Sequence, residues 1–229
     1  MRIGVIGTGN IGGNLARLLV GHGHDLVVSY ARDGRRLAGF AEEIGARAGS
    51  PREAAEHAEA VLLSVPWALV DDALEAAGVA DGTLDGRVVI DTTNQFVPDR
   101  DGYRLLDLGA VSAARLSAAK VPGAHWVKAF NTVTSGFLAD SAGRTGEKRV
   151  VMFYATDSDV AAQVAARLIA DAGFTPARVG DLDHASVLEP PRRAGSVFGE
   201  EYRLADADDV LEAVRAGQPL PPAPPYSQQ

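Results

Sequence analysis

The sequence predicts a doubly wound α/β fold, in which helices cover both faces of a parallel sheet. Short apolar runs, such as residues 3–6 and 88–91, alternate with segments of helical periodicity. This order is typical of consecutive β-α-β units. The runs are largely apolar, as expected of strands that are buried on both faces. The 229 residues are 46% hydrophobic and 23% charged, which is sufficient for an extensive core.

The first 91 residues supply five expected strands and the helices that connect them. The expected strands are residues 3–6, 26–28, 46–48, 61–65 and 88–91. The expected helices begin at residue 11, cover residues 34–45, begin again at residue 51, and cover residues 67–77. Ser50, Pro51 and Glu53 form the signature of a helix start. Gly21 and Gly23 end the first helix.

The pattern is less regular after residue 92. We expect residues 95–110 to form a loop, because Pro98 and Gly102 interrupt them. The later elements expected are helices at residues 112–120, 158–172 and 206–216, and strands at residues 126–130, 150–155 and 177–179. The tail, residues 219–229, holds five prolines and is expected to be extended and mobile.

Composition and charge exclude several classes of function. The net charge of −8 repels phosphate backbones, so we expect no nucleic-acid partner. The absence of cysteine excludes disulfides and cysteine nucleophiles, and the five histidines lack paired metal-ligand spacing, so no metal is expected. No apolar run approaches the roughly 18 residues that span a bilayer, and no signal-peptide pattern is present. We expect a cytoplasmic protein without a membrane partner, and a homodimer.

Gly7, Gly9 and Gly12 form a G-x-G-x-x-G motif between the first strand and the first helix. In that position the motif is typical of a Rossmann-type dinucleotide-binding fold. Gly7 permits the tight turn, Gly9 lets a pyrophosphate approach the helix N-terminus, and Gly12 lets helix and strand pack closely. Thr8 and Asn10 offer additional side-chain hydrogen bonds. The alternative is a βα turn that binds no ligand.

The end of the second strand decides between NAD and NADP. An NAD site needs a carboxylate about 20 residues after the motif. The chain has no carboxylate at this point, where it carries Ser29, Tyr30, Ala31 and Arg32. A hydroxyl and a guanidinium suit a 2′-phosphate, so the sequence predicts NADP. Arg35 or Arg36 is placed to add positive charge, while Asp33 suits a helix N-cap. The alternative for Arg32 is a solvated surface residue.

Two further segments follow strands at the carboxyl edge of the predicted sheet, where open α/β folds bind ligands. The segment SVPW places Ser64, Val65 and Pro66 at this edge. The segment DTTN, residues 91–94, places Asn94 there as well. Its Asp, Thr and Asn residues suit an ordinary turn equally well.

The chain resembles the F420-dependent NADP oxidoreductase family in four segments. These are MRIGVIGTGNIGGNLARLLVGHGHDLVVSYAR, VLLSVPW, VKAFNT and DSDVAAQVAARLIADAGFTPARVG. The same group includes the NADP-binding domain of the STEAP-type metalloreductases. The resemblance implies a Rossmann-type NADP-binding domain over residues 1–182, including a small C-terminal α/β extension at about 125–182. Residues 183–229 remain as a C-terminal segment with the Pro-rich tail.

The resemblance also implies roles for individual residues. Residues 8–11, which include Ile11, hold the pyrophosphate, and residues 29–32 hold the 2′-phosphate. Val65 and Pro66 border the ribose and the nicotinamide. Asn131 and Ser135 lie where the two redox rings meet, and Asn131 acts by positioning only. The F420 enzymes usually carry a histidine at the position of Asn131, whereas the STEAP-like members share the AFNT form.

The sequence contains no convincing acid–base pattern. Tyr103 is followed by Asp107 where the Tyr-x-x-x-Lys motif of short-chain dehydrogenases needs lysine. The remaining candidate donors, each more typical of a structural or surface position, are His125, Lys128, His184 and Tyr202. Hydride exchange between nicotinamide and a flavin or deazaflavin needs mainly two rings held face to face.

The sequence therefore predicts an oxidoreductase that transfers hydride between NADP(H) and a second redox cofactor, with F420 preferred over a flavin. One alternative is an NADPH-dependent flavin, quinone or ferric reductase, or a pathway-specific C=C or C=N reductase. The other is a non-catalytic NADP-sensing module. Because F420 is anionic, its site needs local positive charge. The candidate residues for that charge are Lys120, Lys128, Arg192 and Arg193.

Overall fold

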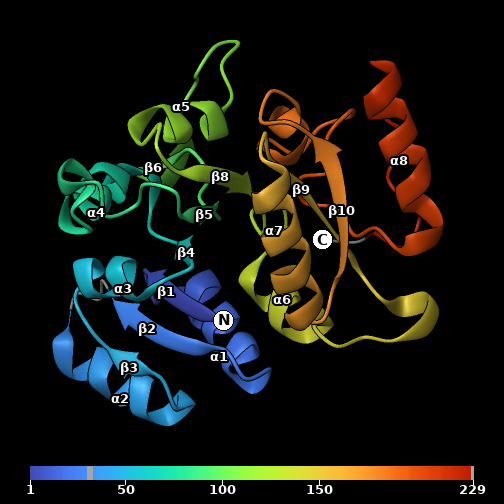
Figure 1. Ribbon diagram of the computed structural model, residues 1–229. Helices are drawn as coiled ribbons and strands as arrows, with labels where there is room; N and C mark the ends of the chain where they lie inside the picture. Colours follow the sequence, from blue (N-terminus) through green and yellow to red (C-terminus); the bar gives the residue numbers. More distant parts are fainter. Residues whose placement is uncertain (30–32, 228–229) are drawn as a thin grey trace.

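The computed structural model describes residues 1–29 and 33–227 and contains a large sheet with helices on both faces (Figure 1). The strands of this sheet are β1 (Arg2–Ile6), β2 (Asp25–Ser29), β3 (Arg47–Ala48), β4 (Ala60–Leu63), β5 (Val88–Asp91), β8 (His125–Lys128), β9 (Val151–Ala155) and β10 (Thr175–Gly180). Their order is β10-β9-β8-β5-β4-β1-β2-β3. The predicted doubly wound α/β fold is confirmed, and each predicted strand is present.

The direction of the last two strands differs from the predicted parallel arrangement. Strands β3, β2, β1, β4, β5 and β8 are parallel, whereas β9 pairs with β8 in antiparallel fashion. The only residues paired between β8 and β9 are Lys128 and Ala155, which stand at the ends of both strands. An apolar run carries no information about strand direction, so the sequence pattern could not reveal this reversal.

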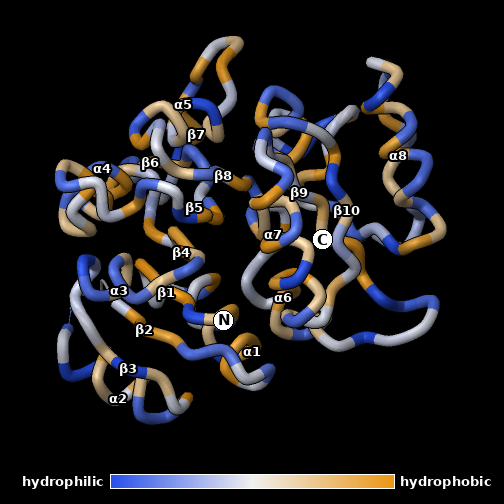
Figure 2. Tube along the Cα trace, in the orientation of Figure 1, coloured by the Kyte–Doolittle hydropathy of each residue, from blue (hydrophilic) through white to orange (hydrophobic). Residues whose placement is uncertain are grey.

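The helices form two layers that are separated by the sheet. The helices are α1 (Asn10–Gly21), α2 (Gly34–Ile44), α3 (Pro51–His57), α4 (Val70–Ala76), α5 (Ala113–Lys120), α6 (Ser135–Ser141), α7 (Asp159–Asp171) and α8 (Leu204–Ala216). Helices α1, α2, α6 and α7 share one hydrophobic core, and α3, α4, α5 and α8 share the other. The central strands are largely hydrophobic (Figure 2), as a sheet covered on both faces requires. Within the described residues, no helix is long and apolar enough to cross a membrane.

Local signals in the sequence fix several helix starts. Ser50 accepts a hydrogen bond from the Glu53 backbone N–H, and the Glu53 carboxylate accepts one from the Ser50 N–H. This capping box confirms the predicted start of α3. The helix expected at residues 67–77 is divided into a 3₁₀ turn, Trp67–Leu69, and α4.

Two segments between residues 92 and 150 differ from the expectation. Residues 95–110 were expected to form a loop, but they contain an antiparallel hairpin of β6 (Phe96–Asp99) and β7 (Gly102–Leu105). The hairpin is mostly exposed, so its strands lack the buried apolar run that marks the others. Helix α6 was also not predicted, because its seven residues are too few for a periodic pattern.

The Pro-rich tail is tied to the body of the protein as far as residue 227. The Tyr226 hydroxyl accepts a hydrogen bond from the Arg203 N–H and donates one to Asp206. The Ser227 hydroxyl accepts one from the Glu201 N–H at 2.7 Å and donates one to the Glu200 carboxylate. The expected mobility of the tail is therefore wrong over these residues, because its last polar side chains are anchored. Helix α8 packs against β10, so the described part of the C-terminal segment, residues 183–227, contributes to the core of the main sheet.

Candidate functional site

The glycine turn joins β1 to α1 and leaves no space for larger residues at two positions. Gly7 has a φ of +107°, and a Cβ there would lie 2.2 Å from the Ser64 carbonyl oxygen. A Cβ on Gly12 would lie 2.0 Å from the Gly7 carbonyl oxygen. Because neither glycine carries a Cβ, the start of α1 can lie tightly against the end of β1. The predicted strand–turn–helix context of the motif is confirmed.

Gly9 faces open space instead. A Cβ at this position would have no atom within 4 Å, and Gly9 serves as the N-cap of α1 without a side-chain hydrogen bond. Thr8, Asn10 and Ile11 are all at least partly exposed. The first N–H groups of a helix have no partner within the helix, and its dipole attracts negative charge. The turn therefore fits the pyrophosphate of a dinucleotide.

The predicted 2′-phosphate site lies only partly within the described residues. Ser29 is completely buried, and its hydroxyl donates to the Val5 carbonyl at 3.0 Å, so its proton is committed inside the sheet. The predictions for Tyr30 and Arg32 fall on residues outside the described part of the chain. Asp33 caps α2 by accepting the Arg35 and Arg36 N–H groups, which agrees with the expected N-cap. The Arg36 side chain is exposed on the first turn of α2.

The carboxyl ends of β1, β4 and β5 lie side by side. The Ser64 N–H donates to the Ile6 carbonyl at 2.8 Å, and the Thr92 N–H donates to the Leu63 carbonyl at 3.1 Å. Val65 is buried and Pro66 is exposed at this edge. The segments GTGN, SVPW and DTTN are thus brought to one edge of the sheet, as the motifs predicted.

Asn94 and Asn131 bind each other at the same edge. The Asn94 amide donates to the Asn131 carbonyl at 2.9 Å, and the Asn131 amide donates to Asn94 Oδ1 at 3.0 Å. Asn131 Nδ2 also donates to the Leu188 carbonyl at 2.7 Å, while Asn131 Oδ1 is buried without a partner among the described residues. Phe130, directly before it, has a φ of +60°. Such strain in a buried aromatic residue is typical of functional sites.

Ser135 lies at the start of α6 and is brought against α1. Its backbone carbonyl accepts a hydrogen bond from the Asn14 amide at 2.9 Å. Asn14 lies one turn after the glycine motif, so this bond links the dinucleotide turn to the segment that follows Asn131.

Comparison with known proteins agrees with this geometry. Residues 2–95 match the family described as "NADP oxidoreductase coenzyme F420-dependent". The description of the matching family names NADP oxidoreductases.

Similar proteins extend the likeness beyond residue 95. The rat protein "Metalloreductase STEAP3" is 27% identical over 188 residues, which cover 82% of this chain and 36% of that protein. The chain thus spans about a third of the length of this relative. A structure titled as a putative F420-dependent NADP-reductase from Arthrobacter sp. FB24 has a TM-score of 0.70 and 25% identity, covering 81% of this chain and 87% of that one.

Two other solved structures share the fold. A hypothetical protein from Sinorhizobium meliloti has a TM-score of 0.73 and 25% identity, and the match covers 89% of this chain and 95% of that one. An imine reductase from Streptomyces aurantiacus has a TM-score of 0.58 and 19% identity, over 79% of this chain and 56% of that one. The second likeness concerns the fold alone.

The structure gives Lys128 a structural position. Its side chain is fully buried, and its ammonium group donates to the Asp91 carboxylate at 3.1 Å and to the Thr93 carbonyl. This agrees with the structural role that the sequence favoured over a proton donor, and it does not fit the candidate role in binding an anionic ligand, because the ammonium group is buried and paired. The two charges instead join the ends of β5 and β8.

The other candidate proton donors also have contacts of their own. His125 begins β8 opposite Val88, at the edge of the sheet away from Asn131. His184 Nδ1 lies 2.8 Å from Asp181 Oδ1. Tyr202 is buried edge-on against Phe153, and burial raises the pKa of its hydroxyl to about 12. The structure does not bring these side chains to the Asn94–Asn131 pair.

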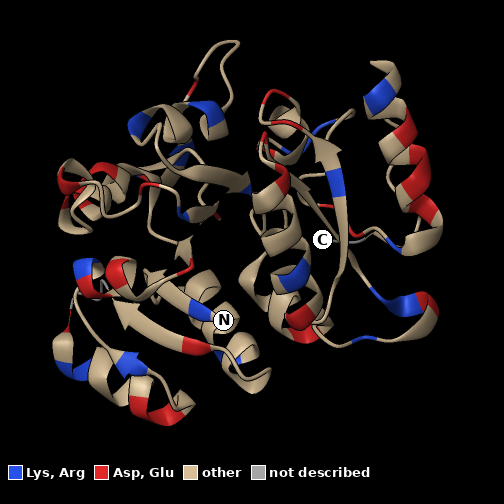
Figure 3. Cartoon of the chain, in the orientation of Figure 1, with Lys and Arg blue, Asp and Glu red and all other residues tan. Residues whose placement is uncertain are grey.

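The candidate basic residues are dispersed, and acidic and basic side chains are interspersed over the elements (Figure 3). Lys120 pairs with Asp71, and Arg192 forms a two-armed ion pair with Glu200. The Arg193 guanidinium donates to three backbone carbonyls, those of Ser186, Glu189 and Pro191. Of these residues, Arg193 alone lines a pocket beside the Asn94–Asn131 pair.

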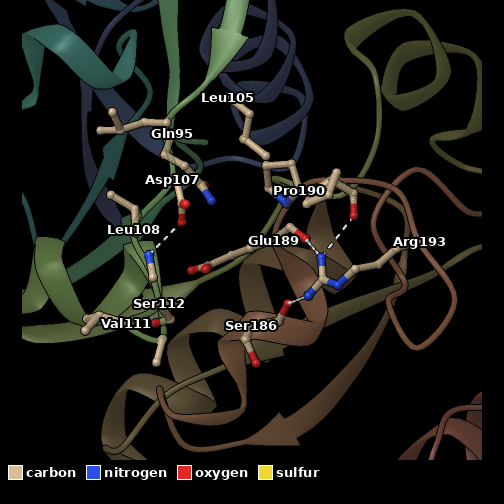
Figure 4. Close-up of a pocket in the computed structure, with 14 residues that line it drawn as sticks. Gln95, Leu105, Asp107, Leu108, Val111, Ser112, Ser186, Glu189, Pro190 and Arg193 are labelled. Carbon is tan, nitrogen blue, oxygen red and sulfur yellow. Dashed lines mark hydrogen bonds between the residues drawn. The ribbon is translucent and has the colours of Figure 1, made fainter.

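This pocket has a volume of about 380 Å³ and lies between residues 105–112 and 186–193 (Figure 4). Two of its polar residues, Gln95 and Glu189, were not singled out from the sequence. Gln95 directly follows the DTTN segment, and its place after this segment was the one sequence feature that could have indicated a role in the site. The Glu189 carboxylate accepts the N–H groups of Ala113 and Ala114 at the start of α5. Burial raises the pKa of Glu189, and the nearby Lys128 charge opposes that rise.

Proposed function

We propose that this protein transfers hydride between NADP(H) and coenzyme F420. The observation that carries the proposal is the single sheet edge shared by an open glycine turn and an Asn94–Asn131 pair with an adjacent pocket. A two-cofactor oxidoreductase needs two neighbouring binding places of this kind. The description of the matching family and the name of the Arthrobacter structure support F420 as the second cofactor.

The chemistry consists of one hydride transfer that the protein organises. With both cofactors bound, the C4–H bond of NADPH would supply a hydride to C5 of the deazaflavin ring, and water would supply the proton for N1 of that ring. The start of α1 holds the pyrophosphate through its N–H groups. Val65 and Pro66 lie beside the nicotinamide. Three hydrogen bonds to Asn94 and Leu188 fix Asn131, which sets the position at which the two rings meet.

A panel of acceptors tests the proposal. The purified protein is mixed with NADPH and, in separate reactions, F420, FMN, a ferric chelate or a quinone. We expect F420 to give the highest kcat/KM and NADH to be a much poorer donor. Turnover of another acceptor without F420 reduction would contradict the F420 assignment, and turnover of none would favour an NADP sensor.

A ferric or flavin reductase is the second candidate. The AFNT sequence around Asn131 and the similarity to rat metalloreductase STEAP3 favour it. The chain covers only 36% of that relative, so the likeness concerns the part that resembles the NADP-binding domain. The same panel separates this candidate from the first, because it contains the ferric chelate and FMN.

A further inference from the structure

We propose that the pocket beside Asn94 binds the ring of the redox acceptor, and that Gln95 selects rings with adjacent N–H and C=O groups. The inference rests on the proposed function. It adds to that function a chemical class of acceptor and the residue that recognises it. Both F420 and flavins carry such an edge on their pyrimidinedione ring, whereas ferric chelates and quinones do not.

The Gln95 side chain is the feature of the pocket that indicates a ligand. It is 94% buried, since only 6% of its surface is exposed, and it lines the pocket. Its Oε1 has no partner, and the structure gives its amide no hydrogen bond among the described residues. Leaving a buried polar group unpaired is unfavourable. A ligand that pairs with this amide removes that cost.

The geometry of an amide defines the complementary ligand. A primary amide presents one acceptor and one donor side by side in a plane. Its best partner therefore presents a donor next to an acceptor, as a cyclic N–H and C=O do. Leu105, Leu108, Val111 and Pro190 supply apolar walls on which a planar ring can lie (Figure 4).

The pocket adjoins the predicted meeting point of the rings. Gln95 directly follows Asn94, which binds Asn131. Asn131 in turn donates to the Leu188 carbonyl, and Leu188 directly precedes Glu189 in the pocket wall. Two pocket residues are thus next in sequence to this hydrogen-bonded group: Gln95 follows Asn94, and Glu189 follows Leu188. A ring held by Gln95 would therefore lie beside the Asn94–Asn131 pair.

The charges of the pocket favour the ring over an anionic tail. Asp107 and Glu189 both line it, and each carboxylate accepts backbone N–H groups. Arg193 stands at the border, where it also lines a second pocket of about 480 Å³ together with Arg192.

The test uses riboflavin and N3-methylriboflavin as probes, because the methyl group removes only the ring N–H. Both are titrated against the wild-type protein, Gln95→Leu and Gln163→Leu by fluorescence quenching. Gln163 is exposed on α7 and serves as the matched control. NADPH affinity and Tm are measured for all three proteins. We expect neither to fall in Gln95→Leu, because leucine replaces an amide that has no partner.

We expect the wild type and Gln163→Leu to bind riboflavin roughly ten- to a hundredfold more tightly than N3-methylriboflavin, because the methyl group removes the N–H donor and leaves the buried Gln95 Oε1 unpaired. Gln95→Leu should lose this preference. Equal affinity of the wild type for the two probes, no binding of either, or an unchanged preference in Gln95→Leu would overturn the inference. F420 turnover by the wild type is measured separately. If the wild type does not turn over F420 but still prefers riboflavin to N3-methylriboflavin, the proposed function is contradicted and the Gln95 assignment stands.

Discussion

Gly9 and Gly12 belong to the same motif, but a methyl group would have different effects at the two positions. At Gly12 it would meet the Gly7 carbonyl at 2.0 Å, whereas at Gly9 it would meet no protein atom within 4 Å. We expect Gly12→Ala to destabilise the fold by about 1–3 kcal/mol, which lowers Tm by several degrees. Gly9→Ala should cost less than about 1 kcal/mol of stability and still weaken NADPH binding, because its methyl occupies the pyrophosphate position.

Calorimetry measures the Tm of the Gly9→Ala and Gly12→Ala variants, and titration with NADPH measures the affinity of each. Normal NADPH affinity in Gly9→Ala would contradict the placement of the pyrophosphate at this turn.

Arg32 carries the predicted preference for NADP. Arg32→Ala should weaken NADPH binding by about 1.5–3 kcal/mol, the contribution of a hydrogen bond to a charged group. This corresponds to roughly a ten- to hundredfold change in Kd, with NADH affinity nearly unchanged. Isothermal titration with both nucleotides measures the effect, and Arg167→Ala, on the exposed surface of α7, is the control. Equal losses for NADPH and NADH would show that Arg32 does not contact the 2′-phosphate.

The buried Lys128–Asp91 pair predicts a large effect on stability. Lys128→Met leaves the Asp91 carboxylate buried without its ammonium partner, which should cost about 3–5 kcal/mol. Lys120→Met removes a lysine from the exposed Asp71 pair and should cost less than about 1 kcal/mol. Urea denaturation of both variants compares the two. Similar losses would show that burial does not govern the strength of the Lys128 pair.

Sequence and structure agree best for residues whose role is local. The glycines of the turn, the capping box and the Asp33 N-cap follow from short-range rules, and the structure contains them all. Gln95 and the true position of Lys128 depend on contacts between distant segments. Nothing in the sequence reveals that one amide is buried without a partner or that one ammonium faces Asp91.

At the scale of elements, burial decided which parts were predictable. Strands covered on both faces appear as apolar runs, and all were found. The β6–β7 hairpin is exposed, with Tyr103 at 72% exposure, so its strands carry only a weak hydrophobic pattern. Pro98 and Gly102 therefore led to the prediction of a loop. The antiparallel pairing of β9 with β8 depends on one residue pair and has no local signal.

Glu189, whose carboxylate accepts N–H groups at the start of α5, should make the stability of the fold depend on pH. Burial raises the pKa of this carboxyl in the folded protein above its ordinary value of 4.5. The unfolded chain then releases the proton first as pH rises. The contribution of Glu189 to stability is therefore fully present below pH 4.5 and decreases as pH rises through the raised pKa.

Glu189→Gln cannot titrate and isolates this effect. The difference in unfolding free energy between wild type and Glu189→Gln, measured by urea denaturation from pH 4 to pH 8, should shift in favour of the variant as pH rises. A difference that stays constant, or one that shifts in favour of the wild type, would contradict the raised pKa.

At the scale of the whole molecule, the fold brings three segments to one sheet edge. The glycine turn follows β1, SVPW follows β4, and the Asn94–Asn131 pair joins the ends of β5 and β8. His125, His184 and Tyr202 are held in other contacts. We therefore propose catalysis by proximity of the two rings, with none of these three side chains acting as acid or base.

Isotope transfer tests this account most directly. NADPH carrying deuterium at one of the two C4 positions is mixed with F420 and excess enzyme for a single turnover, and the products are analysed by mass spectrometry. For one of the two labelled forms, the account predicts deuterium on C5 of reduced F420 and none in the water. Deuterium in the water, or reduced F420 that is unlabelled with both forms, would contradict direct hydride transfer.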